Sequence, residues 1–339
     1  MPFHYPVGKL PAEHLARLLN QYAPRDPRLI AGPSVGQDAA VIDMGDRYLV
    51  AKSDPITFAA ENIGWYAVNI NANDVACTGA VPRWFLATLL LPEHETTPAL
   101  VDAIFEQIHS ACADLGITVV GGHTEITYGL DRPVVAGHLL GEVSPDRLVT
   151  TAGARVGDDL LLTKGIAIEA TAIIAAEKRS LLEGRFEKDS LNDYANFLYN
   201  PGISVVRDAA AAVEAGGVHA MHDPTEGGVA TGLHELAEAA GVGLEIEETA
   251  LPYLPETVAL CRFFGLDPLG IIASGALLIA ADPDRTPHIL DSLNRHGIAA
   301  ARIGRVTPAG AGRVLVAADG TRRPLPVFAR DEITRLFGD

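Results

Sequence analysis

The chain has 339 residues, of which 48% are hydrophobic and 20% charged, so it is long enough for two domains with full cores and is not disordered. Acidic residues outnumber basic ones by 43 to 26, and the formal net charge of −17 excludes the basic surface expected of a nucleic-acid-binding protein. The three cysteines are widely spaced and form no C-x-x-C pair, which excludes a disulfide framework and a zinc knuckle.

The N-terminal sequence M-P-F-H-Y-P-V-G-K-L contains no apolar run of signal-peptide length. No segment of the chain approaches the roughly 18 continuous apolar residues of a membrane span. Together with the cysteine pattern, these features predict a cytoplasmic protein that does not associate with a membrane.

The first predicted elements are an amphipathic helix over residues 11–20 and a β-hairpin. The hairpin has strands over 36–43 and 47–54 around a turn at Gly45. If Gly45 is its centre, Asp38 and Asp54 lie on one face, one diagonal and roughly 7–8 Å apart, within reach of a single bridging cation. A register shift of one residue would place them on opposite faces.

The stretch 69–82, N-I-N-A-N-D-V-A-C-T-G-A-V-P, predicts a helix that ends at Gly79. Its polar residues, Asn69, Asn71, Asn73 and Asp74, spread around more than half of the helix circumference and form no clean polar stripe. One interpretation is a packed helix whose amides hold neighbouring loops. The other is that Asp74 and the amides face a bound polyanion or a metal ion.

After this helix we expect a buried strand over 83–92, a helix over 97–115 and a strand over 117–120. The strand should end in the loop G-G-H-T-E-I-T, where Gly121 and Gly122 allow a ligand to approach the backbone. His123 and Glu125 follow at once, but two side chains are too few to predict a transition-metal site. A hydrogen-bonding or structural role for His123 therefore stays open.

A strand over 133–143 and a junction over 152–159 divide the chain into predicted domains of residues 1–150 and 151–339. The second half begins with a strand over 160–163 and a helix from residue 168. Residues 178–200 are charged and predict a helical excursion at the surface.

A helix over 203–215 and a strand over 219–222 lead to the turn D-P-T-E-G-G and a helix over 229–240. Asp223 or Thr225 should cap this helix, whose free N–H groups are suited to an oxyanion, although such turns are common. The remaining predicted elements are strands over 244–246, 271–279 and 301–306, a helix over 287–294, a hairpin at Asp319–Gly320 and a closing helix. The alternation of strands and helices predicts an α+β fold of α/β layers.

Five motifs in this order, G-Q-D-A-A-V, K-S-D-P-I, N-A-N-D-V-A-C-T-G-A-V-P, V-V-G-G-H-T-E and D-P-T-E-G-G-V-A-T, resemble the AIR synthase (PurM) superfamily. This superfamily includes the hydrogenase maturation factor HypE, thiamine-monophosphate kinase and selenophosphate synthetase, and the second half is most similar to HypE. The resemblance spans about residues 30–310. Five ordered motifs are far more specific than any single one.

The resemblance implies a PurM-like two-domain architecture, with an N-terminal domain that dimerises through its sheet and a C-terminal α/β sandwich. It implies that ATP and Mg²⁺ bind near the interface of this homodimer, where Mg²⁺ bridges carboxylates to phosphate oxygens. Asp38, Asp54 and Asp74 are the implied metal ligands, and Asp74, His123 and Glu125 the implied catalytic residues. The implied cofactor-binding residues are Asp38, Asp54, Asn71, Asn73, Gly121, Gly122, Thr124, Asp223, Thr225, Gly227 and Gly228.

The sequence also departs from its relatives. HypE proteins end in a cysteine whose carbamoyl group is dehydrated, whereas this sequence ends T-R-L-F-G-D, so the standard HypE reaction on its own tail is not expected. Gln37 stands where HypE and thiamine-phosphate kinases usually have a second acid. The reactive N-terminal residue of selenophosphate synthetase and the glycine-rich G-T-K segment of AIR synthase are both missing.

We therefore expect an ATP- and Mg²⁺-dependent enzyme that activates an amide or acyl oxygen, or phosphorylates a small molecule. Its acceptor is a small molecule or a protein. No G-x-x-x-x-G-K-[ST] phosphate loop occurs in the sequence. Two alternatives remain open: a nucleotide- or partner-binding protein without catalysis, and a small-molecule kinase similar to thiamine-monophosphate kinase.

Overall fold

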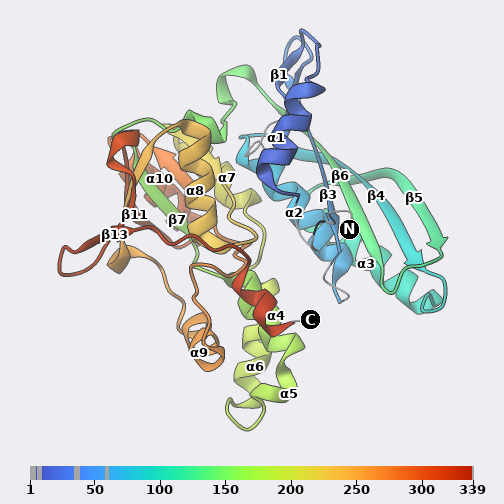
Figure 1. The fold of residues 1–339 in the computed structure, drawn as a ribbon. Helices are drawn as coiled ribbons and strands as arrows, with labels where there is room; N and C mark the ends of the chain where they lie inside the picture. Colours follow the sequence, from blue (N-terminus) through green and yellow to red (C-terminus); the bar gives the residue numbers. More distant parts are fainter. Residues whose placement is uncertain (1–4, 6–9, 34–38, 58–60, 338–339) are drawn as a thin grey trace.

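The computed structural model describes residues 5, 10–33, 39–57 and 61–337, and the predicted α+β class is confirmed: two β-sheets carry the helices (Figure 1). The first half contains α1 (Ala12–Gln21), β1 (Leu29–Ala31), β2 (Ala40–Asp43), β3 (Tyr48–Ile56), α2 (Ile63–Cys77), β4 (Val81–Pro92), α3 (Pro98–Leu115), β5 (Thr118–Thr127) and β6 (Val134–Val143). They form a sheet of order β1-β2-β3-β6-β4-β5, in which only β4 and β5 are parallel among the described pairs.

The second half forms a sheet of order β13-β12-β9-β11-β7-β10-β8. Its strands are β7 (Asp159–Thr163), β8 (Val218–His222), β9 (Gly243–Glu247), β10 (Leu278–Ala281), β11 (Ala300–Thr307), β12 (Arg313–Val316) and β13 (Arg322–Pro324). Its helices are α4 (Ile168–Glu177), α5 (Arg179–Leu182), α6 (Lys188–Ala195), α7 (Val206–Ala215), α8 (Gly228–Ala240), α9 (Pro255–Phe264) and α10 (Thr286–Arg295). Short 3-10 helices are η1 (Pro145–Arg147), η2 (Thr151–Gly153), η3 (Asn196–Leu198), η4 (Glu248–Ala250), η5 (Ala309–Ala311) and η6 (Glu332–Leu336).

The central strand β7 is buried on both faces, as its unbroken run of apolar residues predicts. Leu160 and Leu162 enter the core that includes α4 and α8, whereas Leu161 enters the core that includes α7 and α10. The second sheet therefore lies between two helical layers. None of the helices in the described part of the chain is long and apolar enough to cross a membrane.

Helix α2 lies between the two halves of the molecule (Figure 1). It packs on β3, β4, β6 and α3 on one side and on α7 and β8 on the other. Every one of its residues except Trp65 is buried. Because protein surrounds the helix, it needs no polar stripe, which explains the spread of polar residues in its sequence.

The predicted hairpin of β2 and β3 is present, but its predicted register is wrong by one residue. Ala40 lies opposite Ala51, and Asp43 lies opposite Tyr48. The cause is a four-residue turn, closed by a hydrogen bond from Met44 N to Arg47 O, in place of a turn centred on Gly45. The geometric argument that paired Asp38 with Asp54 therefore loses its basis, and Asp38 and Gln37 lie outside the described residues.

Strand β5 continues through the segment predicted to be a loop after residue 120. A bulge shifts its pairing with β4, so that Phe85 lies opposite Val119 and Leu86 opposite Gly121. A Cβ atom on Gly122 would lie 2.0 Å from the carbonyl oxygen of Ala87. The glycine at this position is thus required by the close approach of β4.

Two expectations for the second half are wrong, and one helix was not predicted. The strand predicted over 271–279 is present only as β10, residues 278–281, because the chain turns at Gly275, which has a φ of +110°. Helix α9 was not predicted, and the closing helix is only the 3-10 turn η6. The other predicted strands and helices are present, with ends that differ by a few residues.

Candidate functional site

Two of the predicted acidic ligands lie together around a lysine. Lys52 Nζ is 2.8 Å from Asp74 Oδ2 and 3.6 Å from Asp54 Oδ2. Residues 52 and 54 alternate with 53 along β3, so both side chains point to the face that α2 covers. The side chains of Lys52, Asp54 and Asp74 are 15%, 42% and 8% exposed, which gives a largely buried charged cluster with one side open to solvent.

Sequence reasoning missed Lys52, although its signal was the spacing K-x-D along one strand. An ammonium group between two carboxylates indicates that this place suits a cation. Among the described residues no group of three or more His, Cys, Asp and Glu side chains has the arrangement of a metal site. Two carboxylates are nevertheless the ligands through which proteins usually hold Mg²⁺ beside a phosphate, so the donor set fits that ion.

Asn71 completes this cluster on the α2 side. Its Nδ2 donates to the carbonyl oxygens of Ala67, at 2.8 Å, and of Asp54, at 3.2 Å. Its Oδ1 is buried and has no hydrogen-bond partner among the described residues. A buried acceptor of this kind is suited to a ligand that brings an N–H or O–H donor, or a positive charge.

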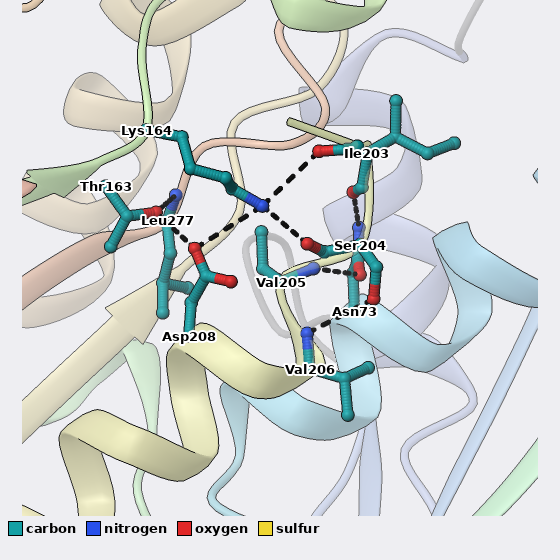
Figure 2. Close-up of polar contacts among 10 residues, drawn as sticks. Asn73, Thr163, Lys164, Ile203, Ser204, Val205, Val206, Asp208 and Leu277 are labelled. Atoms are coloured by element: carbon teal, nitrogen blue, oxygen red, sulfur yellow. Dashed lines mark hydrogen bonds and ion pairs between the residues drawn. The ribbon is translucent and has the colours of Figure 1, made fainter. Parts of the chain in front are cut away.

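Asn73, two residues further along, holds the second half of the molecule. Its Nδ2 donates to Ile203 O at 2.9 Å, and its Oδ1 accepts from Val205 N at 2.8 Å (Figure 2). Both ends of this amide therefore bind backbone. Asn73 thus behaves as in the interpretation in which amides of the helix hold a neighbouring loop. A contact between Asn73 and a nucleotide stays a prediction.

A buried ion pair holds the same segment from the other side. Lys164 Nζ donates to Ser204 O at 2.5 Å and lies 3.4 Å from Asp208 Oδ1, which also accepts from the Thr163 hydroxyl at 2.6 Å (Figure 2). Burial lowers the pKa of Lys164, and Asp208 opposes that effect. Sequence reasoning gave no signal for this pair, because its two residues are 44 positions apart.

The turn from Asp223 to Gly228 meets α2 at its C-terminal end. Cys77 Sγ donates to Asp223 Oδ1 at 3.5 Å, and both residues are buried. The prediction that Asp223 or Thr225 caps α8 is wrong, since Gly227 is the N-cap, with a φ of +78°. Its N–H donates to Asp331 Oδ2 at 2.6 Å, so a carboxylate from the C-terminal segment occupies this anion-binding position.

The structure does not bring His123 and Glu125 to Asp74 within one chain. Strand pairing places His123 in a row with Thr88, Ala136 and Pro55, three strand spacings or about 14 Å from β3. Asp54 is adjacent to Pro55 on β3, and successive side chains of a strand point to opposite faces, so Asp54 and His123 lie on opposite faces of the sheet. His123 Nε2 and Glu125 Oε2 lie 3.3 Å apart on the exposed edge strand.

Thr124 and Gly121 also lie on this edge strand, whereas Thr225 is half-buried in the 223–228 turn. The assignment of these residues, and of Gly122, Gly227 and Gly228, to a nucleotide stays a prediction. For Gly228 the structure offers a packing reason, because an added Cβ atom would lie 2.5 Å from Leu269 O.

The most unusual buried group was not predicted from the sequence. Glu169, in the first turn of α4, is only 5% exposed, and Ser274 is the polar residue beside its carboxyl group. Burial raises its pKa to about 7, Ser274 acts in the opposite direction, and the nearby carboxylates of Asp331 and Glu226 raise it further. Such a carboxyl group can hold or release a proton at neutral pH.

The three cysteines are buried, and burial raises the pKa of Cys112 and Cys261 to about 12, so these two are not reactive thiolates. A depression of about 400 Å³ near α10 is lined by Arg285, His288 and Arg295, among others, and contains no predicted site residue. The buried carboxylates around α2 are therefore a better candidate for a functional site than this open surface.

Residues 36–143 match the N-terminal domain, and residues 155–317 the C-terminal domain, of AIR synthase related proteins. The carbamoyl dehydratase HypE of Rhizobium leguminosarum bv. viciae is 33% identical over 270 residues, 77% of this chain and 72% of that protein. The carbamoyl dehydratase HypE of Escherichia coli strain K12 is 30% identical over 298 residues, 86% of this chain and 83% of that protein.

Three solved structures have similar folds. A HypE protein in complex with ATP has a TM-score of 0.71 and 25% identity, with 96% of this chain and 97% of that chain covered. A chain of a HypE-HypF complex has a TM-score of 0.75 at 21% identity, with 93% of this chain and 98% of that chain covered. AaThiL complexed with AMPPCP and TMP has a TM-score of 0.67 at 22% identity, with coverages of 85% and 88%.

Proposed function

Because this chain belongs to the AIR synthase related family, we propose that it is an ATP- and Mg²⁺-dependent enzyme that activates an amide or acyl oxygen, or phosphorylates a small molecule. Two relatives at 30% identity or more are named carbamoyl dehydratases, and a HypE structure at 25% identity contains ATP. The observation that carries the proposal is the cluster of Asp54, Lys52 and Asp74, which α2 joins to the Asp223 turn.

The chemistry follows from the charges of this cluster. Mg²⁺ held by Asp54 and Asp74 would neutralise phosphate charge in a protein whose net charge is −17. Lys52 adds a positive charge whose position is fixed by the two carboxylates. Phosphoryl transfer needs positioning and charge stabilisation more than a covalent nucleophile, so an enzyme of this kind does not require a catalytic triad.

We also propose that the protein is a homodimer formed through the first sheet. Leu86, Leu90, Ala136 and Leu140 point away from α2 and are half-buried in the single chain. A second copy would cover this apolar face, and His123 and Glu125 would then face the partner instead of their own chain's Asp74. The absence of any disulfide among the three cysteines supports a cytoplasmic location.

One observation favours a protein that binds a nucleotide or a partner without catalysis. Asp331 already accepts the hydrogen bond of the Gly227 N–H, which would otherwise be available to a phosphate oxygen. A kinase similar to thiamine-monophosphate kinase is a third candidate, supported by the fold of AaThiL alone. An assay of phosphate transfer to thiamine monophosphate would test the kinase directly.

Thermal unfolding with and without Mg-ATP tests the nucleotide site. At a ligand concentration 100 times the dissociation constant, we expect a stabilisation of about 3 kcal/mol in the wild type. Asp74→Asn should remove this ligand-dependent increment, whereas the exposed control Asp193→Asn should retain it. The increment is compared within each variant, because loss of the Lys52 ion pair also changes the basal stability.

A stabilised wild type that also releases the γ-phosphate with a pool of acceptors would support the enzyme. Stabilisation without turnover would favour the binding protein. No stabilisation in any variant would overturn the proposal and leave the fold with another ligand.

A further inference from the structure

Lys52 lies between the two acids that are proposed to hold Mg²⁺. Its Nζ is 2.8 Å from Asp74 Oδ2 and 3.6 Å from Asp54 Oδ2. The oxygens that would bind a divalent cation are therefore the same oxygens that hold the ammonium group. Since two positive charges in contact repel each other, Lys52 and a metal ion compete for this pair of carboxylates.

The burial of the cluster strengthens this competition. The side chains of Lys52 and Asp74 are 15% and 8% exposed, and salt and water screen partly buried charges much less than exposed ones. Two carboxylates and one ammonium group leave one net negative charge, against two without the ammonium group. The cluster of the free protein is thus only weakly attractive to a divalent cation.

The cluster also includes a buried oxygen without a hydrogen-bond partner. Asn71 lies three positions before Asp74 on α2, so the two side chains share one side of the helix. Asn71 Nδ2 donates to Asp54 O at 3.2 Å, whereas its Oδ1 has no hydrogen-bond partner among the described residues. Amide and carboxylate oxygens are both ligands of hard divalent cations. The donor set therefore suits a metal ion once the ammonium group has moved.

We propose that Lys52 keeps the pair of Asp54 and Asp74 closed to divalent cations in the nucleotide-free protein. The inference rests on the proposed function, because it describes how the metal and the nucleotide enter that same site. Asp54 is 42% exposed and marks the open side of the cluster, from which phosphates would approach. A triphosphate carries more negative charge than two carboxylates and would attract Lys52 on its flexible stem. Movement of the ammonium group toward the phosphates frees the carboxylates, so the metal and the nucleotide bind together.

Binding of Mn²⁺ to the nucleotide-free full chain tests the role of Lys52, with the free ion measured by its EPR signal. We expect Lys52→Met to bind Mn²⁺ at least about tenfold tighter than the wild type, because a positive charge is removed from the site. Adding Asp74→Asn to Lys52→Met should abolish the gain. The matched control is Lys188→Met, which removes the same charge from an exposed position on α6 and should leave the affinity unchanged.

Equal Mn²⁺ affinity in the wild type and Lys52→Met would overturn the inference and leave the Lys52–Asp74 contact as a structural ion pair. If Lys52→Met fails to fold, Lys52→Gln replaces it, because this variant removes the charge and keeps an N–H donor for the carboxylates. Lys52→Arg keeps the charge and should bind Mn²⁺ as weakly as the wild type, so a gain in this variant would contradict the competition.

Stabilisation by Mg-ATP is measured in the same samples, which separates the two proposals. Stabilisation of the wild type without a gain of Mn²⁺ affinity in Lys52→Met refutes the role of Lys52 alone. A gain of Mn²⁺ affinity without any stabilisation by Mg-ATP refutes the nucleotide function alone.

Discussion

Asn73 and Asp74 are adjacent on α2 but bind opposite halves of the molecule. Asn73 contacts the backbone of Ile203 and Val205, whereas Asp74 contacts Lys52 on β3. Successive side chains on a helix differ by about 100°, so neighbours in sequence can face different layers when both faces are covered. The Asn73 amide therefore holds the two halves together, and the Asp74 carboxylate belongs to the charged cluster around Lys52.

Asn73→Ala tests the structural role of the amide. The substitution leaves the buried Ile203 carbonyl and Val205 N–H without their side-chain partner, which should lower the free energy of unfolding by about 2–4 kcal/mol. Urea denaturation measures the effect. Asn69→Ala is the control, because within the described residues the Asn69 side chain donates to the Trp65 carbonyl of its own helix. A loss of equal size in this variant would contradict the argument.

Glu169→Gln tests the perturbed carboxyl group through the pH dependence of stability. The pKa is about 7 in the folded protein against a reference value of 4.5, so the folded state binds more protons between these values and wild-type stability falls as pH rises through that window. Relative to wild type, Glu169→Gln should gain about 3 kcal/mol between pH 4.5 and pH 7 and then stay constant. Denaturation at a series of pH values measures this gain, and a difference independent of pH would refute the raised pKa.

The element that depends most on distant partners is the segment between η3 and α7. Asn73 holds it from α2, and Lys164, at the end of β7, holds it through the carbonyl of Ser204 (Figure 2). Lys164 has a φ of +56°, an uncommon conformation for a residue with a side chain. The backbone and the ion pair together direct its ammonium group into the segment.

Asp208→Ala should destabilise the protein by about 3–5 kcal/mol, because it leaves the Lys164 ammonium group buried without its counter-ion. The double variant Asp208→Ala with Lys164→Met should recover a large part of this loss, since no buried charge remains. A double-mutant cycle of unfolding free energies measures the coupling. If the effects of the two substitutions are additive, Lys164 and Asp208 are not coupled and the ion pair does not stabilise the fold.

At the scale of the whole molecule, the first sheet has two unlike faces. One face is covered by α2 and α3 (Figure 1). The other face carries half-buried leucines together with His123 and Glu125. The charged cluster and the His123 edge therefore cannot form one site in a single chain. A dimer is the arrangement that would give the edge residues a function, and it stays a proposal.

Leu90→Arg tests the dimer. In a single chain the new side chain is half-exposed and lies beside Glu125, so the fold should tolerate it. In a dimer it would bury a charge, and we expect the dissociation constant to rise by about a hundredfold or more. Sedimentation velocity measures the oligomeric state, with Leu181→Arg on α5 as the exposed control. A monomeric wild type would refute the dimer.

The sequence by itself determined the elements with strong local patterns and the family. Strand β4, helix α3 and strand β6 follow from periodicity, and five ordered motifs predicted the AIR synthase family to which the chain belongs. The sequence also singled out Asp54 and Asp74, which lie on either side of the Lys52 ammonium group. Both acids belong to motifs whose order along the chain matched the family.

Only the tertiary structure decided which residues meet. Lys52 lies between the two acids, Asp331 replaces a local cap at Gly227, and Glu169 is buried beside Ser274, all through contacts between segments distant in sequence. The hairpin register and the face on which His123 lies depend on turn length and strand pairing, where a shift of one residue reverses every side chain. Local periodicity fixes the type of an element, whereas register and packing, which fix its neighbours, are properties of the folded whole.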